Sequence, residues 1–203
     1  MQRKYLILLA VALPVLLLDQ WTKYVAVAEL TNRFDGTQAV SERLSAFLSP
    51  SDEPPFRGLH YEPKRSVTLS ENFFRFRYAE NPGAAFSLFG TLPDRVRVPF
   101  FHLVTIGAVG LILFFFRKLD ASRPGEKLTV WGLSLVVGGA LGNYVDRLAR
   151  GFVVDFLEAH WFHQAYWPAF NIADMAIVVG VGLTFLDGLL HRDRATTPVK
   201  ASS

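Results

Sequence analysis

The chain of 203 residues contains no cysteine, which excludes thiol nucleophiles, cysteine-ligated zinc and disulfide bonds but leaves the redox compartment open. Charged residues are also scarce, at 19%, where soluble domains usually have about 25%. The hydrophobic residues, 51% of the chain, lie in four apolar blocks separated by polar segments, a pattern typical of a polytopic membrane protein. Although the net charge is +3, the basic residues cluster at segment ends and form no basic stripe, so no nucleic-acid binding is expected.

Four transmembrane helices are predicted, over about 5–28, 98–116, 128–147 and 171–190. The first block could instead be a cleavable signal peptide, because Ala26-Val27-Ala28 resembles a small-residue cleavage site. Asp19, Trp21 and Lys23 interrupt it, however, and its apolar stretch continues to the length of a full span, which favours a retained helix. Small surfaces for close helix packing are expected in the third span at Gly132, Gly138, Gly139 and Gly142.

The polar segments between the spans differ in character. Residues 31–63 have loop composition and form an insert with weak periodicity. Residues 67–78 alternate β-branched and aromatic side chains, so strands and a small β-rich platform are predicted there. Residues 148–170 are interpreted as an aromatic-rich loop, whose Trp161 and Trp167 suit a membrane–water interface.

The positive-inside rule sets the predicted orientation. The short segments at the N-terminus, at 117–127 and in the tail 191–203 are basic, so both termini are placed in the cytoplasm. The segments 29–95 and 148–170 then lie in the periplasm. Asp187, near the inner end of the fourth span, is expected to face cytoplasmic water.

Polar residues gather at the predicted outer ends of the third and fourth spans. Asn143, Asp146 and Arg147 stand at i, i+3 and i+4, so they share one helix face; an interfacial cap with a local Asp–Arg pair is an equally open interpretation. Asn171 has the position of an N-cap, and Asp174 lies in the first turn, where the helix dipole favours a negative charge. A purely structural cap therefore stays open for this pair.

Asp155 is harder to explain structurally, because it interrupts an apolar run just after Gly151 and has no local cationic partner. Two antiparallel helices joined by a short outer loop bring their outer ends together, so Asp155 and Asp174 can face each other. When two carboxylates share a site, one keeps its proton and the other loses it. The ionised member can activate a water while the protonated member donates a proton, which favours acid–base hydrolysis.

Five motifs together resemble lipoprotein signal peptidase (signal peptidase II). They are Asp19-Gln-Trp-Thr-Lys23, Asn81-Pro-Gly83-Ala-Ala-Phe86, Gly138-Gly-Ala-Leu-Gly-Asn143-Tyr-Val-Asp146-Arg147, Val153-Val-Asp155-Phe156 and Phe170-Asn171-Ile-Ala173-Asp174. The resemblance runs in order over about 5–190, apart from the insert. It implies a mainly α integral membrane protein with four transmembrane helices and a small periplasmic β-rich cradle. The implied activity is aspartic cleavage of signal peptides from prolipoproteins whose cysteine carries a diacylglyceryl group.

The same resemblance assigns roles to single residues. It implies that Asp155 and Asp174 are the catalytic dyad. The site and substrate would be held by Asn143 and Arg147 on the third span, by Asn171 and Ala173 beside Asp174, by Asp19 and Lys23 on the first span, and by Asn81 and Gly83 from the cradle. Asp146 could rival Asp155, but its neighbour Arg147 favours a salt-bridged, permanently ionised role. The expected partners are the diacylglyceryl-modified signal peptide and membrane lipids, with a monomeric enzyme and neither cofactor nor metal.

Other chemistries are weaker. His160 and His163 are spaced like metal ligands, yet no His-Glu-x-x-His is present, so they are interpreted as interfacial. A Ser–Lys hydrolase needs a serine near Lys23, and Ser87 is the only candidate. The competing function is a small proton-coupled carrier that uses the same carboxylates as a relay. Against it, the carboxylates gather at one membrane face and no inverted repeat is visible.

Overall fold

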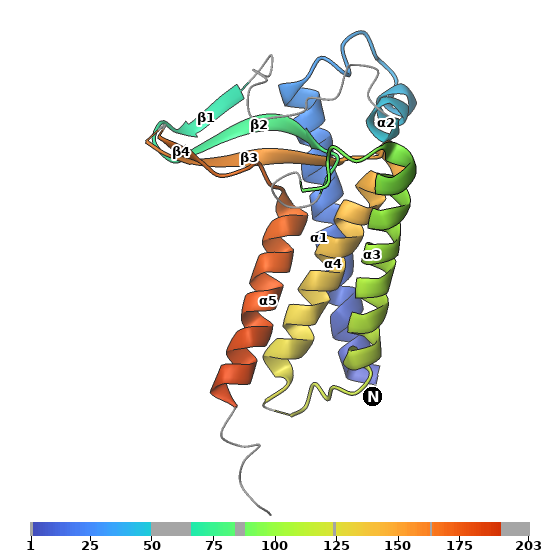
Figure 1. Cartoon of the computed structure of the whole chain (residues 1–203), viewed down its shortest axis with the longest axis vertical. Coiled ribbons are helices and arrows are strands. Elements are labelled where there is room, and N and C mark those ends of the chain that lie inside the picture. Colours follow the sequence, from blue (N-terminus) through green and yellow to red (C-terminus); the bar gives the residue numbers. More distant parts are fainter. Residues whose placement is uncertain (1, 50–65, 84–87, 124, 163, 192–203) are drawn as a thin grey trace, which may run out of the picture.

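The computed structural model describes residues 2–49, 66–83, 88–123, 125–162 and 164–191, and these form a helical bundle with a small sheet at one end (Figure 1). The elements, in chain order, are α1 (Gln2–Leu30), α2 (Val40–Leu48), β1 (Ser66–Ser70), β2 (Phe74–Asn81), α3 (Asp94–Phe116), α4 (Lys127–Arg150), β3 (Val153–Trp161), β4 (Ala165–Tyr166) and α5 (Ile172–Leu190). The sheet lies across one end of the bundle, and the chain begins at the other end (Figure 1).

The helices α1, α3, α4 and α5 are long and apolar enough to cross a membrane. The shortest of them, α5, has 19 residues, and at about 1.5 Å per residue it approaches the hydrocarbon thickness of about 30 Å. The predicted fold class is therefore confirmed: four candidate membrane spans accompany a small antiparallel sheet. The helices run past the predicted limits, since α1 reaches Leu30 and α4 reaches Arg150.

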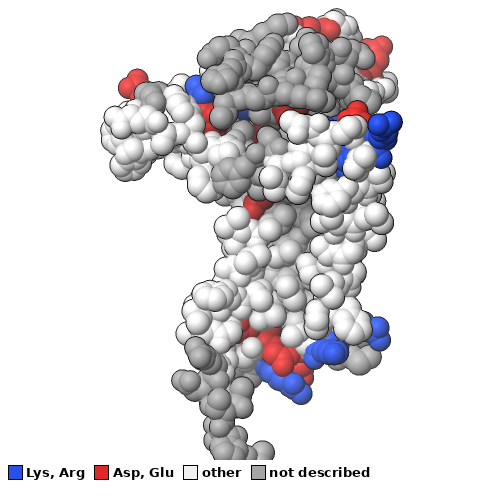
Figure 2. All heavy atoms as spheres, viewed as in Figure 1, with Lys and Arg blue, Asp and Glu red and all other residues white. Residues whose placement is uncertain are grey.

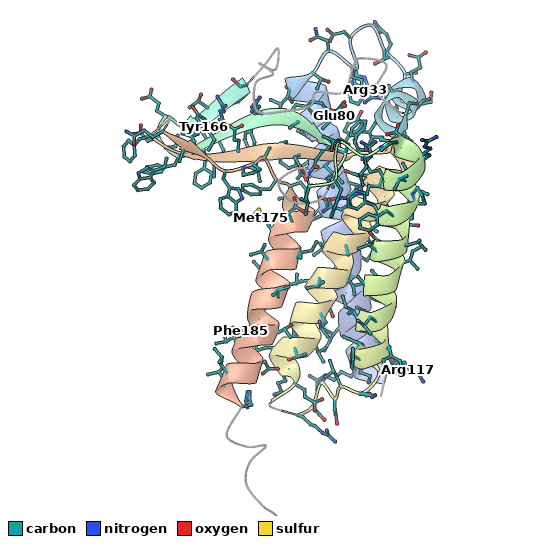
Figure 3. All side chains as sticks on the ribbon, in the orientation of Figure 1. Arg33, Glu80, Arg117, Tyr166, Met175 and Phe185 are labelled. Atoms are coloured by element: carbon teal, nitrogen blue, oxygen red, sulfur yellow. The ribbon has the colours of Figure 1, made fainter. Side chains whose placement is uncertain are left out.

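The surface of the bundle suits a lipid environment. Large apolar side chains such as Leu103, Val178 and Phe185 are exposed. Figure 2 shows Lys, Arg, Asp and Glu mostly at the two ends, with an almost uncharged belt between them. Figure 3 shows Met175 and Phe185 extending outward from α5, while Arg117 lies at the end of α3 away from the sheet. Exposed apolar residues are expected where acyl chains replace water as solvent.

Glycines let α4 approach its neighbours closely. A Cβ built on Gly132 would lie 2.4 Å from the carbonyl oxygen of Gly180 in α5, and one on Gly180 would lie 2.4 Å from the carbonyl oxygen of Gly132. A Cβ on Gly138 would lie 2.9 Å from Ala12 in α1. The glycine surface predicted for this span is therefore a packing surface, as small residues allow in membrane helices.

The segment 148–170 was predicted as a loop, and this is wrong for its central part. Residues 153–161 form β3, which pairs with β2 in the antiparallel order β1-β2-β3-β4. The run from Val153 to Phe156 is buried, and Val154 and Phe156 belong to a hydrophobic cluster that also includes residues of α1 and α2. The register sets Asp155 opposite Ala79 of β2. Asp155 is thus held by a strand and not by a flexible connection.

The insert also holds an element that its composition did not indicate. Residues 40–48 form the short helix α2, and the Glu42 carboxylate accepts hydrogen bonds from the backbone N–H groups of Gln38 and Ala39 at its start. Phe47 is its buried residue and joins the cluster formed by Val27, Leu30 and neighbours. The last part of the predicted insert, 50–63, lies outside the described residues.

Asp187 does not face water as predicted. It is only 1% exposed, and its Oδ2 accepts hydrogen bonds from the backbone N–H of Thr129 at 2.9 Å and from the Thr129 hydroxyl at 2.7 Å. Thr129 lies in the first turn of α4, where backbone N–H groups lack partners within the helix. Asp187 therefore caps α4 from α5 and ties the two helices together.

Candidate active site

The residues singled out in the sequence form one hydrogen-bonded network at the sheet-facing end of the bundle. Every one of them takes part: Asp19, Lys23, Asn81, Gly83, Asn143, Asp146, Arg147, Asp155, Asn171, Ala173 and Asp174. They come from α1, the end of β2, α4, β3 and α5. The two motif aspartates of β3 and α5 are therefore brought into one site.

Four buried charges form the base of this network. The Nζ of Lys23 lies 2.7 Å from Asp19 Oδ2 and 3.0 Å from Asp146 Oδ2, and all three side chains are fully buried. Arg150 pairs with the other oxygen of Asp146. The cluster thus contains two acidic and two basic side chains and is neutral as a whole, which limits the cost of burying charge.

The expected Asp146–Arg147 pair is wrong. Asp146 pairs with Lys23 and Arg150, whereas Arg147 donates to the carbonyl oxygen of Gly83 at 2.9 Å. Adjacent residues point to different sides of a helix, while residues four apart share a face. The salt-bridged role expected for Asp146 therefore has different partners, and this side chain lies in the charged base.

Two asparagines connect the base to the two motif aspartates. Lys23 donates to Asn143 Oδ1 at 3.0 Å, which leaves the amide nitrogen of Asn143 to donate to Asp174 Oδ1 at 2.8 Å. The amide nitrogen of Asn171 donates to Asp155 Oδ1 at 2.7 Å and to Asn143 Oδ1 at 3.1 Å. A fixed chain of donors therefore joins the two carboxylates.

Asp174 sits at the start of α5 in the environment that its sequence position predicted. The side chain of Asn171 accepts from the Asp174 N–H at 3.0 Å, and Asp174 Oδ2 accepts from the Asn171 N–H at 3.2 Å, which completes a capping box. Asp19 accepts from the next free N–H, that of Ala173, at 3.0 Å. The N-cap prediction is confirmed. The Asp174 carboxyl thus accepts from the backbone N–H of Asn171 at the start of α5 and from the Asn143 amide.

Asp155 has a contrasting environment. It is 2% exposed, and its second oxygen accepts from the amide of Asn81 at 3.1 Å. Burial raises the pKa of the Asp155 carboxyl well above its ordinary value, and the nearby charge of Asp174 raises this pKa further. Within the pair, burial therefore favours the protonated form of Asp155.

A cavity of about 690 Å³ opens beside these residues. Its polar end is formed by Asn81, Asn143, Arg147 and Asp174. The rest of its wall is almost wholly apolar and consists of Val153, Trp167, Pro168, Ala169, Phe170, Met175, Ile177, Val178 and Val179. The cavity therefore offers a polar reaction centre together with a wall suited to apolar chains.

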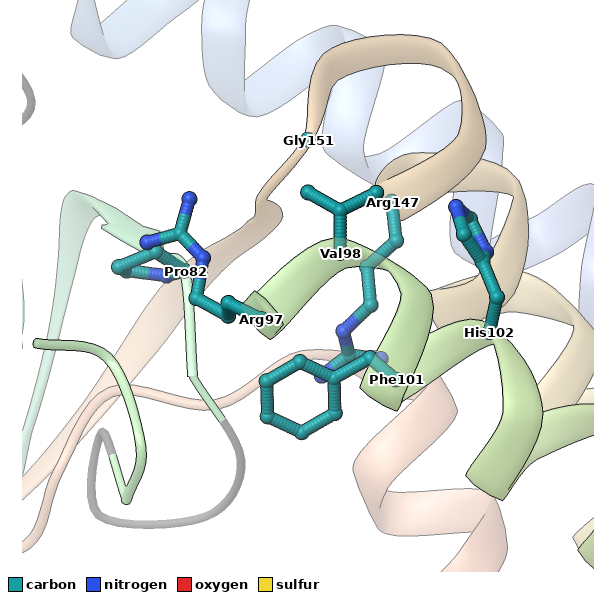
Figure 4. Close-up of a pocket in the computed structure, with 7 residues that line it drawn as sticks. All are labelled: Pro82, Arg97, Val98, Phe101, His102, Arg147 and Gly151. Carbon is teal, nitrogen blue, oxygen red and sulfur yellow. The ribbon is translucent and has the colours of Figure 1, made fainter. Parts of the chain in front are cut away.

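Arg147 borders this cavity and a second, much smaller one between α3 and α4. Its guanidinium lies over the ring of Phe101, 4.8 Å from the centroid. In Figure 4, Arg97, His102 and Arg147 extend from the wall of the smaller cavity in different directions. Their donors do not converge on one point, so they do not form an anion-binding site in this cavity.

Sequence reasoning missed two members of the network. Gln20 donates to Asp146 Oδ1 at 2.8 Å and to the carbonyl oxygen of Gly142 at 3.1 Å, and nothing in its local pattern indicates this role. Arg150 stands four residues after Asp146 on the same helix, and this spacing could have found it. Of the residues weighed for other chemistries, His160 is buried in the sheet near the ring of Tyr166, and His163 and Ser87 lie outside the described residues.

A membrane-spanning bundle with two neighbouring carboxylates beside an open cavity defines a class, the membrane aspartic hydrolases. The comparisons specify it further. A family model described as signal peptidase (SPase) II matches residues 11–190. The chain belongs to the signal peptidase II family and is an aspartic peptidase of that type.

Relatives and solved structures agree with this assignment. The chain is 42% identical over 187 residues to the lipoprotein signal peptidase of Anaeromyxobacter sp. (strain Fw109-5), covering 90% of this chain and 84% of the relative. It is 46% identical over 131 residues to that of Syntrophotalea carbinolica, covering 63% and 78% respectively. A bacterial membrane enzyme solved by the in meso method at 2.3 Å resembles it with a TM-score of 0.63 at 26% identity, covering 100% of this chain and 96% of that one. The protein is a multi-pass bacterial membrane protein.

Proposed function

We propose that this enzyme removes signal peptides from prolipoproteins whose cysteine carries a diacylglyceryl group, with Asp155 and Asp174 as the catalytic dyad. The observation that carries the proposal is the donor chain through Asn143 and Asn171, which joins carboxylates from β3 and α5 beside a cavity with an apolar wall. Holding an ionisable pair near the depth of a bilayer costs free energy, so such a pair by default indicates a functional site.

The environments of the two aspartates support different protonation states. Asp155 is the more buried, and its raised pKa favours the protonated form. Asp174 is less buried and accepts two hydrogen bonds at the start of α5, so it is the member of the pair that we assign as the base. We therefore assign the shared proton at rest to Asp155, although titration belongs to the coupled pair.

The mechanism follows from this division. Asp174 takes a proton from a water whose oxygen attacks the scissile carbonyl carbon, and Asp155 gives its proton to the carbonyl oxygen. When the tetrahedral intermediate collapses, the C–N bond breaks and the proton held by Asp174 passes to the leaving amine. The proton on the former carbonyl oxygen returns to Asp155, so the pair regains its single proton. The described nucleophiles include no activated Ser or Thr, so no acyl-enzyme is invoked.

The cavity supports a substrate that is part peptide and part lipid. Arg147 and Asn143 can hold the peptide carbonyls at its polar end, while Met175 and Val178 on α5 line a lipid-facing path for acyl chains or the signal helix. Binding both parts orients the scissile bond against the dyad, which accounts for much of the rate enhancement in enzymes of this kind.

The orientation that we propose places this site in the periplasm, at the outer face of the inner membrane. The N-terminal end of α1 and the C-terminal end of α5 lie at the same end of the bundle, away from the sheet (Figure 1). The short connection near them carries Arg117, Lys118, Arg123 and Lys127. Short basic segments stay in the cytoplasm, so both termini are cytoplasmic.

The test is cleavage of a purified prolipoprotein, with and without its diacylglyceryl group, followed by mass spectrometry. Asp155→Asn and Asp174→Asn should each leave the lipidated substrate uncleaved while binding persists, and a chelator should not change the wild-type rate. Processing at the wild-type rate by both variants would remove the dyad from the mechanism. Equal cleavage of the unmodified substrate would remove the lipid from recognition.

A further inference from the structure

The insert helix α2 contacts the site network at Phe47. Phe47 is buried, and its ring packs edge-on against Tyr24 of α1 with centroids 5.4 Å apart. The guanidinium of Arg150, at the end of α4, lies 4.2 Å from the centroid of the same ring. Other apolar residues of α2, such as Val40 and Leu44, are exposed, so Phe47 is its anchor. Figure 1 shows α2 above the sheet-side ends of the helices.

Arg150 links Phe47 to Asp146 through polar contacts. Its Nη1 donates to the backbone oxygen of Phe47 at 2.9 Å, and its Nη2 pairs with Asp146 Oδ1. The side chain is fully buried, so neither contact is weakened by water. Because guanidinium donors have a fixed planar geometry, the position of Phe47 fixes the direction in which Arg150 meets Asp146.

Asp146 passes this constraint to the strand that carries Asp155. Its Oδ2 accepts a hydrogen bond from the backbone N–H of Val154 at 3.0 Å. The carbonyl oxygen of Val154 accepts from the amide of Asn171 at 3.2 Å. Both polar groups of the residue before Asp155 are therefore held by the site, one from the charged base and one from α5.

We propose that α2 is a positioning element for Asp155, acting through Phe47, Arg150 and Asp146 on the backbone of Val154. This inference rests on the proposed function, since it assumes that the place of Asp155 limits the chemical step. Loss of the Phe47 ring leaves a void beside the Arg150 guanidinium, which is then held on that side by the backbone oxygen of Phe47 alone and can shift. A shift of about 1 Å at a reacting group can cost about 100-fold in rate. Helix α2 therefore affects kcat through the position of Asp155.

The experiment measures kcat and KM of purified full-length variants on the diacylated prolipoprotein, together with thermal unfolding. Phe47→Ala and Phe47→Leu should lower kcat about 10-fold or more while KM stays within about twofold. Arg150→Met should lower kcat at least as much. Arg150→Lys should recover part of this loss, because it keeps a charge opposite Asp146 but lacks the second arm. Leu44→Ala, an exposed position on the same helix, is the matched control and should match the wild type.

A double variant sharpens the test. Phe47→Ala combined with Arg150→Met should lower kcat no further than Arg150→Met alone, because both act along one path. Additive losses, an unchanged kcat in both Phe47 variants, or a change in KM alone would overturn the inference. A lowered melting temperature with an unchanged kcat would also do so, since it shows a structural role only.

Asp155→Asn in the same assay separates the two proposals. If this variant is inactive and the Phe47 variants are normal, only the role of α2 fails. If it cleaves at the wild-type rate, the dyad fails whatever the Phe47 variants do.

Discussion

Lys23 offers the sharpest test of the buried charged cluster, because its Nζ alone contacts both acids of the cluster and the asparagine that leads to Asp174. Its Nζ contacts Asp19 at 2.7 Å, Asp146 at 3.0 Å and Asn143 Oδ1 at 3.0 Å, with no exposed surface. Lys23→Met keeps most of the side-chain length but removes the cation from Asp19 and leaves Asp146 with Arg150 alone. Removing one partner of a buried ion pair costs about 3–5 kcal/mol. We expect the free energy of unfolding to fall by about this amount.

The same change should lower activity by a separate route. Without Lys23, only Asn171 still donates to the amide oxygen of Asn143, so the hydrogen bond from Asn143 to Asp174 is held less firmly. A hydrogen bond to a charged group contributes about 1.5–3 kcal/mol. At about 1.36 kcal/mol per decade of rate, kcat should fall about 10- to 150-fold. The assay is cleavage well below the melting temperature, alongside thermal unfolding in detergent or lipid.

A charge-compensated variant separates these two effects. Lys23→Met combined with Asp19→Asn restores neutrality and keeps the Asp146–Arg150 pair, so part of the lost stability should return. Activity should stay low, because Asn143 still lacks its hydrogen bond from Lys23. A Lys23→Met protein that unfolds within about 1 kcal/mol of the wild type would refute the reasoning, because the buried base would then contribute nothing to folding.

Three further predictions concern other parts of the molecule. Gly142→Ala places a Cβ 2.6 Å from Asp19 Oδ2, so both melting temperature and kcat should fall, whereas Gly107→Ala, which meets nothing within 4 Å, should not lower either. Burial raises the pKa of Asp155, so its protonated form persists to higher pH than that of an ordinary aspartate. In steady-state kinetics kcat should therefore follow a bell-shaped pH profile and decline on the alkaline side only as pH rises through this raised pKa. A decline of kcat at the ordinary aspartate pKa would contradict the assignment. Asp187→Ala leaves the N–H of Thr129 without its acceptor and should cost about 1–3 kcal/mol in thermal unfolding with kcat unchanged; a fall in kcat at full stability would point to a functional role instead.

Local pattern explains what could be predicted. The four spans follow from run length and hydropathy, because a bilayer of fixed thickness demands about 20 apolar residues per helix. The strands near 67–78 follow from alternation, and the Asn171–Asp174 cap follows from a spacing of three at a helix start. The glycines of α4 marked a packing surface because only a missing Cβ allows backbones to meet so closely.

Each feature that the sequence analysis missed depends on contacts with residues far away in the sequence. The run from Val153 to Phe156 could equally be a buried strand or a loop segment, and only its pairing with β2 decides. α2 is short, and a helix of nine residues is marginal without tertiary contacts, which Phe47 supplies. Asp187 looked like a water-facing end residue, yet its partner Thr129 is 58 positions away.

The sequence by itself determined the number of candidate membrane spans, since this depends on the length of each apolar run. It also named the polar residues of the candidate site, most of them only through motifs that resemble those of a known family. Only the tertiary structure decided which groups those residues contact. Lys23 meets Asn143 across 120 positions and Asn81 meets Asp155 across 74. Partner choice at that separation depends on how helices and strands pack. A charge pattern along one helix therefore named Arg147 as the partner of Asp146, whereas the packed fold supplies Lys23 and Arg150.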